Sequence, residues 1–73
     1  MPLVTVKLIE GVFDADQKRQ MIEKLTDTMV EIEGENMRSV MTVIVEEVRS
    51  GQWGIGGQCF ETADVKALAA GLA

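Results

Sequence analysis

Hydrophobic and polar residues alternate at the start of the chain and predict a β-strand over residues 3–9. One face of this strand would carry Pro2, Val4, Val6 and Leu8, and the other would carry Leu3, Thr5, Lys7 and Ile9. Successive side chains that fall on alternate faces are typical of a β-strand. Glu10-Gly11 is expected to end it.

The next pattern predicts a helix that begins after Asp14 and ends at Gly34. Asp14 is the expected N-cap, and Gln17 follows three residues later, as in a capping box. Apolar residues then recur every three or four positions and form one stripe, which consists of Ile22, Leu25, Met29 and Ile32. Gly34 is the expected stop signal.

A nearly continuous apolar and β-branched run over residues 40–48 predicts a second strand. Such a run is typical of a strand covered on both faces, as in a parallel pair, and completes a β-α-β unit. The glycine-rich stretch 53–57 indicates a loop or one arm of a short hairpin. Thr62 is expected to cap a short helix over residues 63–70, with Val65 and Leu68 facing inward. The predicted fold class is α+β.

A chain of 73 residues with this composition predicts a single small domain, residues 1–73. Its own core is thin, and domains of this size rely on disulfides, metals or self-association. The lone Cys59 cannot close an internal disulfide and is expected to be a buried or partly buried free thiol. Because the chain has no histidine and no cysteine cluster, no metal site is expected. Self-association is therefore the expected way in which this small domain gains stability.

The charge argues against nucleic acid as a partner. Twelve acidic and seven basic residues give a formal net charge of −5, whereas nucleic-acid binders need a basic face. No apolar run approaches the roughly 20 residues that span a bilayer, so no membrane association is expected. No signal peptide is recognisable, and we expect a cytoplasmic, reducing location.

The candidate for chemistry is Pro2, which follows Met1 directly. Aminopeptidases generally remove Met1 when proline follows, and this would leave a free secondary amine at the head of an apolar strand. A terminal amine titrates near 8 in model peptides, and burial lowers that value further. Such an amine can act as a general base or as a nucleophile. The alternative is that Pro2 is an ordinary start residue.

Several of these features together resemble the 4-oxalocrotonate tautomerase family of the tautomerase superfamily. They are Pro2, Glu10-Gly11, the capped helix, and Trp53 followed by Gly54-Ile55-Gly56-Gly57. The resemblance runs from Pro2 to Gly57. It implies a tautomerase/MIF-like fold in which two chains pair to form a four-stranded sheet and three pairs form a homohexamer. It also implies that the Pro2 amine moves a proton between the enol and keto forms of an acid, without a cofactor.

Trp53 stands where the family usually has a phenylalanine that walls the site. Two positions depart from the family. Members that act on dicarboxylates carry an arginine after Glu-Gly, where this chain has Val12. They carry a second arginine in the second strand, where this chain has Thr42 or, in the other alignment, Met41. Because valine and threonine cannot replace a bidentate guanidinium, efficient turnover of 4-oxalocrotonate itself is not expected.

Arg38 and Arg49 are the candidate substrate-binding cations that would act from another direction. The leading hypothesis is a cofactor-independent tautomerase that uses Pro2 as a general base on a small 2-oxo or enol acid. One alternative is a non-catalytic or partner subunit of a mixed hexamer. Another is a proline-dependent hydratase or Schiff-base activity at the same amine.

Overall fold

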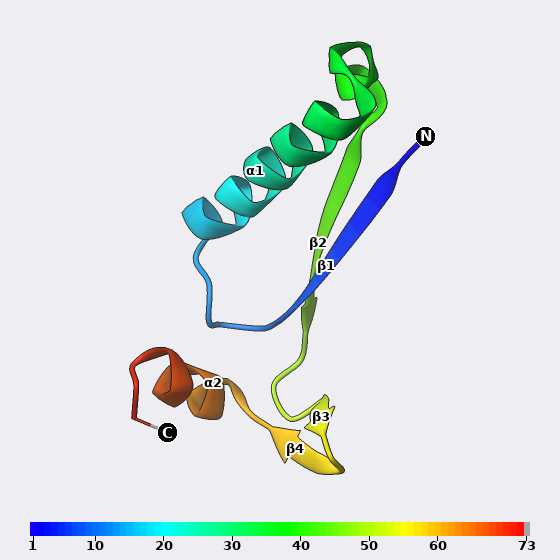
Figure 1. Cartoon of the computed structure of the whole chain (residues 1–73). Coiled ribbons are helices and arrows are strands. Elements are labelled where there is room, and N and C mark those ends of the chain that lie inside the picture. Colours follow the sequence, from blue (N-terminus) through cyan, green and yellow to red (C-terminus); the bar gives the residue numbers. More distant parts are fainter. Residues whose placement is uncertain (73) are drawn as a thin grey trace. The chain divides into compact units, whose positions relative to one another are not determined.

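The computed structural model describes residues 1–72 of the chain, so residue 73 of the expected domain lies outside the described residues. Figure 1 shows the elements in the order β1 (Leu3–Ile9), α1 (Ala15–Glu33), the 3-10 helix η1 (Glu35–Val40), β2 (Thr42–Val48), β3 (Trp53–Ile55), β4 (Gln58–Phe60) and α2 (Thr62–Ala69). The predicted α+β class, with a β-α-β unit, a hairpin and a C-terminal helix, is confirmed.

The contacts of the chain divide it into two units. Unit 1 holds Met1–Val6 and Asp14–Glu46, and unit 2 holds Lys7–Phe13 and the residues from Glu47 on. Strands β1 and β2 pair in a two-stranded sheet. In unit 1 the Thr42 amide donates to the Pro2 carbonyl (3.2 Å), and in unit 2 the Glu10 amide donates to the Val48 carbonyl (2.8 Å). From the first bond to the second, the residue number rises on both strands, from Pro2 to Glu10 and from Thr42 to Val48. The two strands therefore run parallel.

The capping box predicted for α1 is present. The Asp14 carboxylate accepts a hydrogen bond from the Gln17 amide (2.7 Å), and the Gln17 side-chain oxygen accepts one from the Asp14 amide (3.0 Å). These bonds satisfy two backbone donors that a helix start leaves without partners. At the other end Gly34 has a φ of 106° and its amide donates to the Val30 carbonyl (2.8 Å). Both predicted ends of the helix are confirmed.

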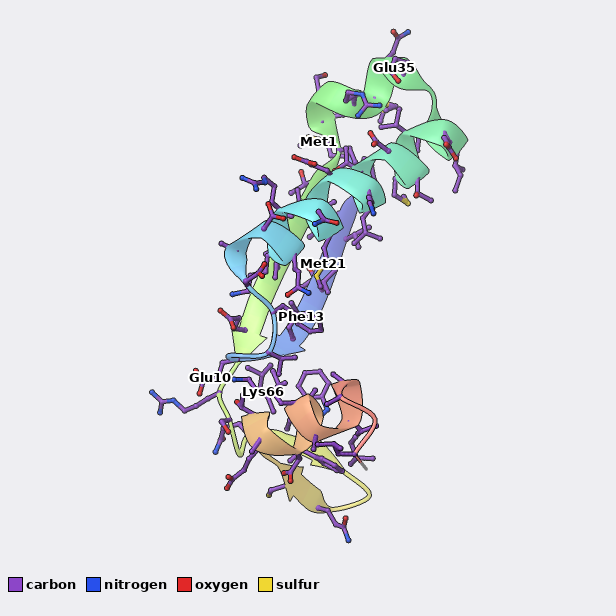
Figure 2. The ribbon with its side chains drawn as sticks, turned by 90° about the vertical axis from the view of Figure 1, so that its left-hand side faces the viewer. Met1, Glu10, Phe13, Met21, Glu35 and Lys66 are labelled. Carbon is purple, nitrogen blue, oxygen red and sulfur yellow. The ribbon has the colours of Figure 1, made fainter. Side chains whose placement is uncertain are left out.

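The covered stripe of α1 is rotated from the predicted one. Met21, Leu25 and Met29 are half-buried, and Figure 2 shows Met21 extending from α1 toward the sheet. Leu25 and Met29 were therefore predicted correctly. Ile22 and Ile32 are 39% and 78% exposed, so their place in the stripe was wrong. Leu25 and Met29 can form an apolar stripe either with Ile22 and Ile32 or with Met21. In the folded chain the stripe that includes Met21 is the covered one.

Strand β2 differs from its prediction in two respects. It begins at Thr42 because η1 takes residues 35–40. One face of β2 carries exposed side chains at Thr42, Ile44 and Glu46. The strand was expected to be covered on both faces, and in the single chain this expectation was wrong. The expected thin core is found: among the described residues, Ile9 and Val30 are the buried hydrophobic side chains, at 5% and 4% exposure.

In unit 2 the glycine-rich stretch forms the turn and first arm of a hairpin, as predicted. β3 and β4 are antiparallel, with Trp53 opposite Phe60 and Gly54 opposite Cys59. Gly56 and Gly57 have φ of 58° and 83°, which suits a tight two-residue hairpin turn. Cys59 is exposed, so its predicted burial was wrong. Neighbouring strand residues point to opposite faces, and Cys59 alternates with the half-buried Phe60.

Helix α2 begins one residue earlier than predicted, and its N-cap is Glu61 instead of Thr62. The Glu61 amide donates to the Asp64 carboxylate (2.8 Å). The Thr62 hydroxyl donates instead to the Glu10 carbonyl (2.6 Å). A predicted local cap has therefore become a bond between elements 52 positions apart within unit 2.

Candidate functional site

Pro2 lies half-buried at the head of β1 in unit 1, where the Thr42 amide holds its carbonyl. Met1 precedes it and is 93% exposed. Figure 2 shows Met1 at the same end of unit 1 as Glu35. With Met1 attached, the nitrogen of Pro2 is part of a tertiary amide that has no N–H. This nitrogen becomes a secondary amine only when Met1 is removed.

Arg38 lies on η1, and two carboxylates already bind its guanidinium. Its Nε donates to Glu35 Oε1 at 2.7 Å, and its Nη1 donates to Asp27 Oδ1 at 2.8 Å. The hydrogen bond to Glu35 raises the pKa of Arg38, and the same bond lowers the pKa of the Glu35 carboxyl. An acidic substrate at Arg38 would therefore compete with two carboxylates of the chain itself.

The two positions at which the resembling family carries arginines are uncharged in this chain. Val12 is half-buried in the segment between β1 and α1. Thr42 is exposed at the first position of β2, and its hydroxyl donates a long bond of 3.4 Å to the Val40 carbonyl. Neither side chain can offer a bidentate fork to a carboxylate.

The sequence-predicted site residues fall into both units. Pro2 and Arg38 belong to unit 1, whereas Arg49 and Trp53 belong to unit 2. Arg49 is exposed in the turn after β2, where its carbonyl accepts a bond from the Gln52 amide (2.9 Å). The four residues therefore do not form one cluster within a single unit.

A pocket of about 360 Å³ lies within unit 2, and Trp53 forms part of its wall. Phe13 and Phe60 also line it, so it gathers all three aromatic residues of the chain. The remaining lining residues are aliphatic except for one lysine, and they are Lys7, Leu8, Ile9, Ile55, Val65 and Leu68. An apolar aromatic hollow of this size with a single charged group has the usual make-up of a small-molecule site.

Side-chain hydrogen bonds between distant positions join the elements that carry the pocket residues within unit 2. The Glu10 carboxylate accepts a bond from the Ser50 amide (2.9 Å), and the Ser50 hydroxyl accepts one from the Thr62 amide (2.9 Å). The Gly11 amide donates to the Glu47 carboxylate (3.2 Å). Together with the bond from Thr62 to Glu10, these contacts tie the end of β1, the end of β2 and the start of α2 into one framework.

The chain is similar in sequence to a known family of enzymes. The model of a family described as tautomerase enzyme matches residues 2–63, and its match begins at Pro2. The chain belongs to the tautomerase family. The 2-hydroxymuconate tautomerase of Bacillus subtilis is 38% identical over 58 residues, which cover 80% of this chain and 90% of that protein. A probable tautomerase of Helicobacter pylori is 38% identical over 60 residues, which cover 80% and 87%.

Solved structures agree with this assignment. A structure of the 4-oxalocrotonate tautomerase isozymes from Methylibium petroleiphilum aligns with a TM-score of 0.71 and 38% identity, covering 80% of this chain and 90% of that one. The structure of TomN, a homologue from the tomaymycin biosynthetic pathway, aligns with a TM-score of 0.73 and 29% identity. This tautomerase is thus an isomerase of the 4-oxalocrotonate tautomerase type.

The described residues contain no group of three or more histidine, cysteine, aspartate or glutamate side chains that could hold a metal ion. They also contain no helix that is long and apolar enough to cross a membrane.

Sequence reasoning missed the aromatic partners of Trp53. Phe13 and Phe60 stand 40 positions before it and seven after it, and no periodicity links the three residues. One signal was available: the chain has only these three aromatic residues, and two of them flank the glycine turn. Val65 and Leu68 were expected to face inward. Both line the pocket and Val65 is half-buried, but Leu68 is 57% exposed, so the expectation for Leu68 is not confirmed.

Proposed function

We propose that the mature tautomerase uses the secondary amine of Pro2 as a general base on a small 2-oxo or enol acid. The observation that carries this proposal is the family match, which starts at Pro2. The exposure of Met1 supports it, because an exposed terminal residue is accessible to an aminopeptidase. The bond from Thr42 to the Pro2 carbonyl would hold the amine in place at the head of β1.

The proposed chemistry needs no group beyond this amine to carry the proton. The neutral amine accepts the proton of the enol hydroxyl, the C–O bond becomes a carbonyl, and the ammonium delivers a proton to the neighbouring carbon. A terminal amine has a pKa near 8 in model peptides, and apolar surroundings lower it toward neutrality. The lower this pKa, the larger the fraction of the amine that is unprotonated at physiological pH, as a general base requires.

The substrate we propose is a monoacid. Val12 and Thr42 offer no charge where the resembling family binds a second carboxylate, and Arg38 is already engaged by Asp27 and Glu35. We further propose that Trp53 contributes an apolar wall, as its family position implies. Arg49 and Arg38 stay candidates for attracting the acid. We propose that self-association, as a homohexamer, completes the site. Exposed apolar side chains such as Leu3 (59%) and Ile44 (41%) support this assembly.

A matched pair of chains tests the role of the amine. Chemical synthesis can supply residues 1–73 and residues 2–73, which differ only in whether the Pro2 nitrogen is an amide or an amine. We expect the chain that starts at Pro2 to ketonise phenylenolpyruvate, and the chain with Met1 to be slower by roughly 10²- to 10⁴-fold, the usual contribution of a general base. Mass determination of the protein purified from cells establishes which form occurs there.

Three further measurements complete this test. Sedimentation velocity must give the same assembly for both chains, so that a loss of rate is a loss of chemistry. For the chain that starts at Pro2, kcat/KM should rise with pH as the amine loses its proton. Equal rates for the two chains would overturn the proposal. An inactive chain starting at Pro2 would favour the partner-subunit alternative.

A further inference from the structure

Glu33, the last residue of α1 in unit 1, carries a carboxylate that the proposed mechanism does not use. Its side chain is half-buried, and its Oε2 atom is buried without a hydrogen-bond partner among the residues that the structure describes. A buried carboxylate oxygen costs free energy unless a donor or a cation meets it. A donor at this end of unit 1 would remove that cost.

Glu33 lies on the covered face of α1. It follows the half-buried Met29 by four residues and the buried Val30 by three. Residues three and four positions apart share one face of a helix. The residues on either side of Glu33, Ile32 and Gly34, are exposed. Glu33 therefore continues the covered stripe of the helix toward its C-terminal end.

Pro2 lies on the covered face of the sheet at the same end of unit 1. On β1 the side chains of Pro2, Val4 and Val6 are half-buried, whereas the residues between them, at positions 3 and 5, are exposed. Alternate residues of a strand share a face, so Pro2 belongs to the face that α1 covers. The 3-10 helix η1 leads from the end of α1 to Thr42, whose amide donates to the Pro2 carbonyl (3.2 Å). Figure 1 shows the end of α1 and the N-terminus at one end of unit 1.

The charged groups around this end are accounted for by contacts of their own or lie elsewhere. On η1, Arg38 binds Glu35 and Asp27. The strand segments 2–6 and 41–45 carry no titratable side chain. The other cations of unit 1 lie on α1 more than two helical turns before Glu33, and they are Lys18, Arg19 and Lys24. Removal of Met1 would add a donor here, because a neutral secondary amine has one N–H and its protonated form has two.

We propose that the Glu33 carboxylate accepts a hydrogen bond from the Pro2 amine of the mature chain and positions that amine for proton transfer. The contact requires only the removal of Met1, whereas its role in the reaction rests on the proposed function. With its N–H held by Glu33, the neutral amine directs its lone pair toward the substrate. After it takes the proton of the enol hydroxyl, the ammonium keeps one N–H on Glu33 and delivers the other proton to the neighbouring carbon. Glu33 itself takes up and gives up no proton.

The pKa of the Pro2 amine tests the contact without relying on catalysis. Chemical synthesis can supply the chain that starts at a ¹⁵N-labelled Pro2, and the nitrogen chemical shift followed against pH gives this pKa. Because a nearby carboxylate favours the ammonium form, Glu33→Gln should lower the pKa of the amine by about 1. Glu31→Gln is the matched control: it removes the same charge two residues earlier, at an exposed position of α1. Solvent screens that charge, and the pKa of the amine should change by less than about 0.3.

The pH profile of ketonisation tests the role of this contact in the reaction. In Glu33→Gln the rise of kcat/KM for phenylenolpyruvate should move to a pH lower by about 1. The plateau at high pH should fall by about threefold, because a less basic and less well held amine is a poorer general base. Glu33→Asp keeps the charge on a shorter side chain and should lie between wild type and Glu33→Gln. Circular dichroism and sedimentation velocity should be the same for all four chains.

A measurement on the unaltered sequence covers a Glu33→Gln chain that does not fold. The Glu33 carboxyl carbon is labelled with ¹³C in the chain that starts at Pro2 and in the chain with Met1. In the chain that starts at Pro2, the carboxyl shift should change again as the amine loses its proton. This second change should be absent from the chain with Met1, in which the Pro2 nitrogen is an amide.

The outcomes separate this proposal from the proposed function of Pro2. Equal amine pKa values in Glu33→Gln and Glu31→Gln would overturn the contact, and so would a Glu33 carboxyl shift without a second change. If Glu33→Gln lowers the pKa of the amine but no chain ketonises phenylenolpyruvate, the contact stands and the function proposed for Pro2 is overturned. If the wild type ketonises and Glu33→Gln has the same pH profile and plateau, the function of Pro2 stands and the positioning role of Glu33 is overturned.

Discussion

Units 1 and 2 differ in the sequence separation that their longest reported side-chain hydrogen bonds span, although α2 of unit 2 is also capped locally, by Asp64 on the Glu61 amide. In unit 1 the bonds that cap α1 join Asp14 and Gln17, three positions apart, and Arg38 binds Glu35 over the same separation. In unit 2 the bonds of Glu10 and Gly11 reach partners 36, 40 and 52 positions away. Unit 1 is therefore organised largely by local sequence, whereas the pocket of unit 2 depends on contacts that form only when the chain has folded.

The two units also differ in which candidate functional features they contain. Unit 1 carries the proline at which the family match begins, on a strand whose pattern is legible from the sequence. Unit 2 carries the pocket, and its α2 wall lies beyond that match. Substitutions that disrupt long-range contacts should therefore cost more in unit 2 than substitutions of local caps cost in unit 1.

The largest effect on stability is expected for Gly11→Ala in unit 2. Gly11 has a φ of 80°, and a Cβ there would lie 3.1 Å from Thr62 Cγ2. Thr62 cannot turn away without losing the bond from its hydroxyl to the Glu10 carbonyl. Backbone strain and crowding together should lower the free energy of unfolding by about 2–3 kcal/mol. Urea unfolding followed by circular dichroism measures this change.

Gly57→Ala separates strain from crowding. Gly57 has nearly the same φ, 83°, and nothing lies within 4 Å of its added Cβ. Gly57→Ala should therefore lower the free energy of unfolding by backbone strain alone, about 1 kcal/mol. Equal losses at Gly11 and Gly57 would show that the contact with Thr62 contributes nothing, and the contrast between the two units would weaken accordingly.

The same contrast explains which parts of the fold could be predicted from sequence. The ends of α1 were predicted because Asp14, Gln17 and Gly34 act on their own neighbours in the chain. The N-cap of α2 was predicted at Thr62 and was wrong, because a distant carbonyl of Glu10 takes the Thr62 hydroxyl. A local rule cannot include a partner 52 positions away.

The candidate site divides in the same way. Pro2 and Trp53 were reached by their positions within a family pattern, which encodes tertiary structure indirectly. Phe13 and Phe60 were not reached, because nothing in their spacing shows that they face Trp53. The exposure of Cys59 was also missed. Whether Cys59 is buried depends on which face of the three-residue strand β4 is covered, and the composition of the chain does not determine this.

A smaller effect is expected for Asp14→Ala in unit 1. The substitution removes the bond from the Asp14 carboxylate to the Gln17 amide and so breaks the capping box. The loss should be about 1 kcal/mol, the usual cost of removing an N-cap. Asp16→Ala is the control: it removes the same charge from the first turn, together with the bonds that Asp16 accepts from Arg19 and Gln20, while the cap is left in place. A control that costs as much as Asp14→Ala would mean that the charge and side-chain bonds of the first turn contribute as much as the cap.

The smallest effect on the free energy of unfolding is expected at the exposed Arg38–Glu35 pair, and it should depend on pH. The hydrogen bond from Arg38 lowers the pKa of the Glu35 carboxyl in the folded chain. A lowered pKa means that the pair stabilises the fold above the ordinary glutamate value of about 4.3, and that this stabilisation is lost as pH falls through the lower folded value. The difference in unfolding free energy between the wild type and Arg38→Gln should therefore be small at pH 7 and shrink below pH of about 4.3. The same comparison in a Glu35→Gln background should depend less on pH, because the titrating group is gone. A difference that is unchanged between pH 7 and pH 3 would mean that Arg38 acts on stability through Asp27 or through packing of η1, and not through its bond to Glu35.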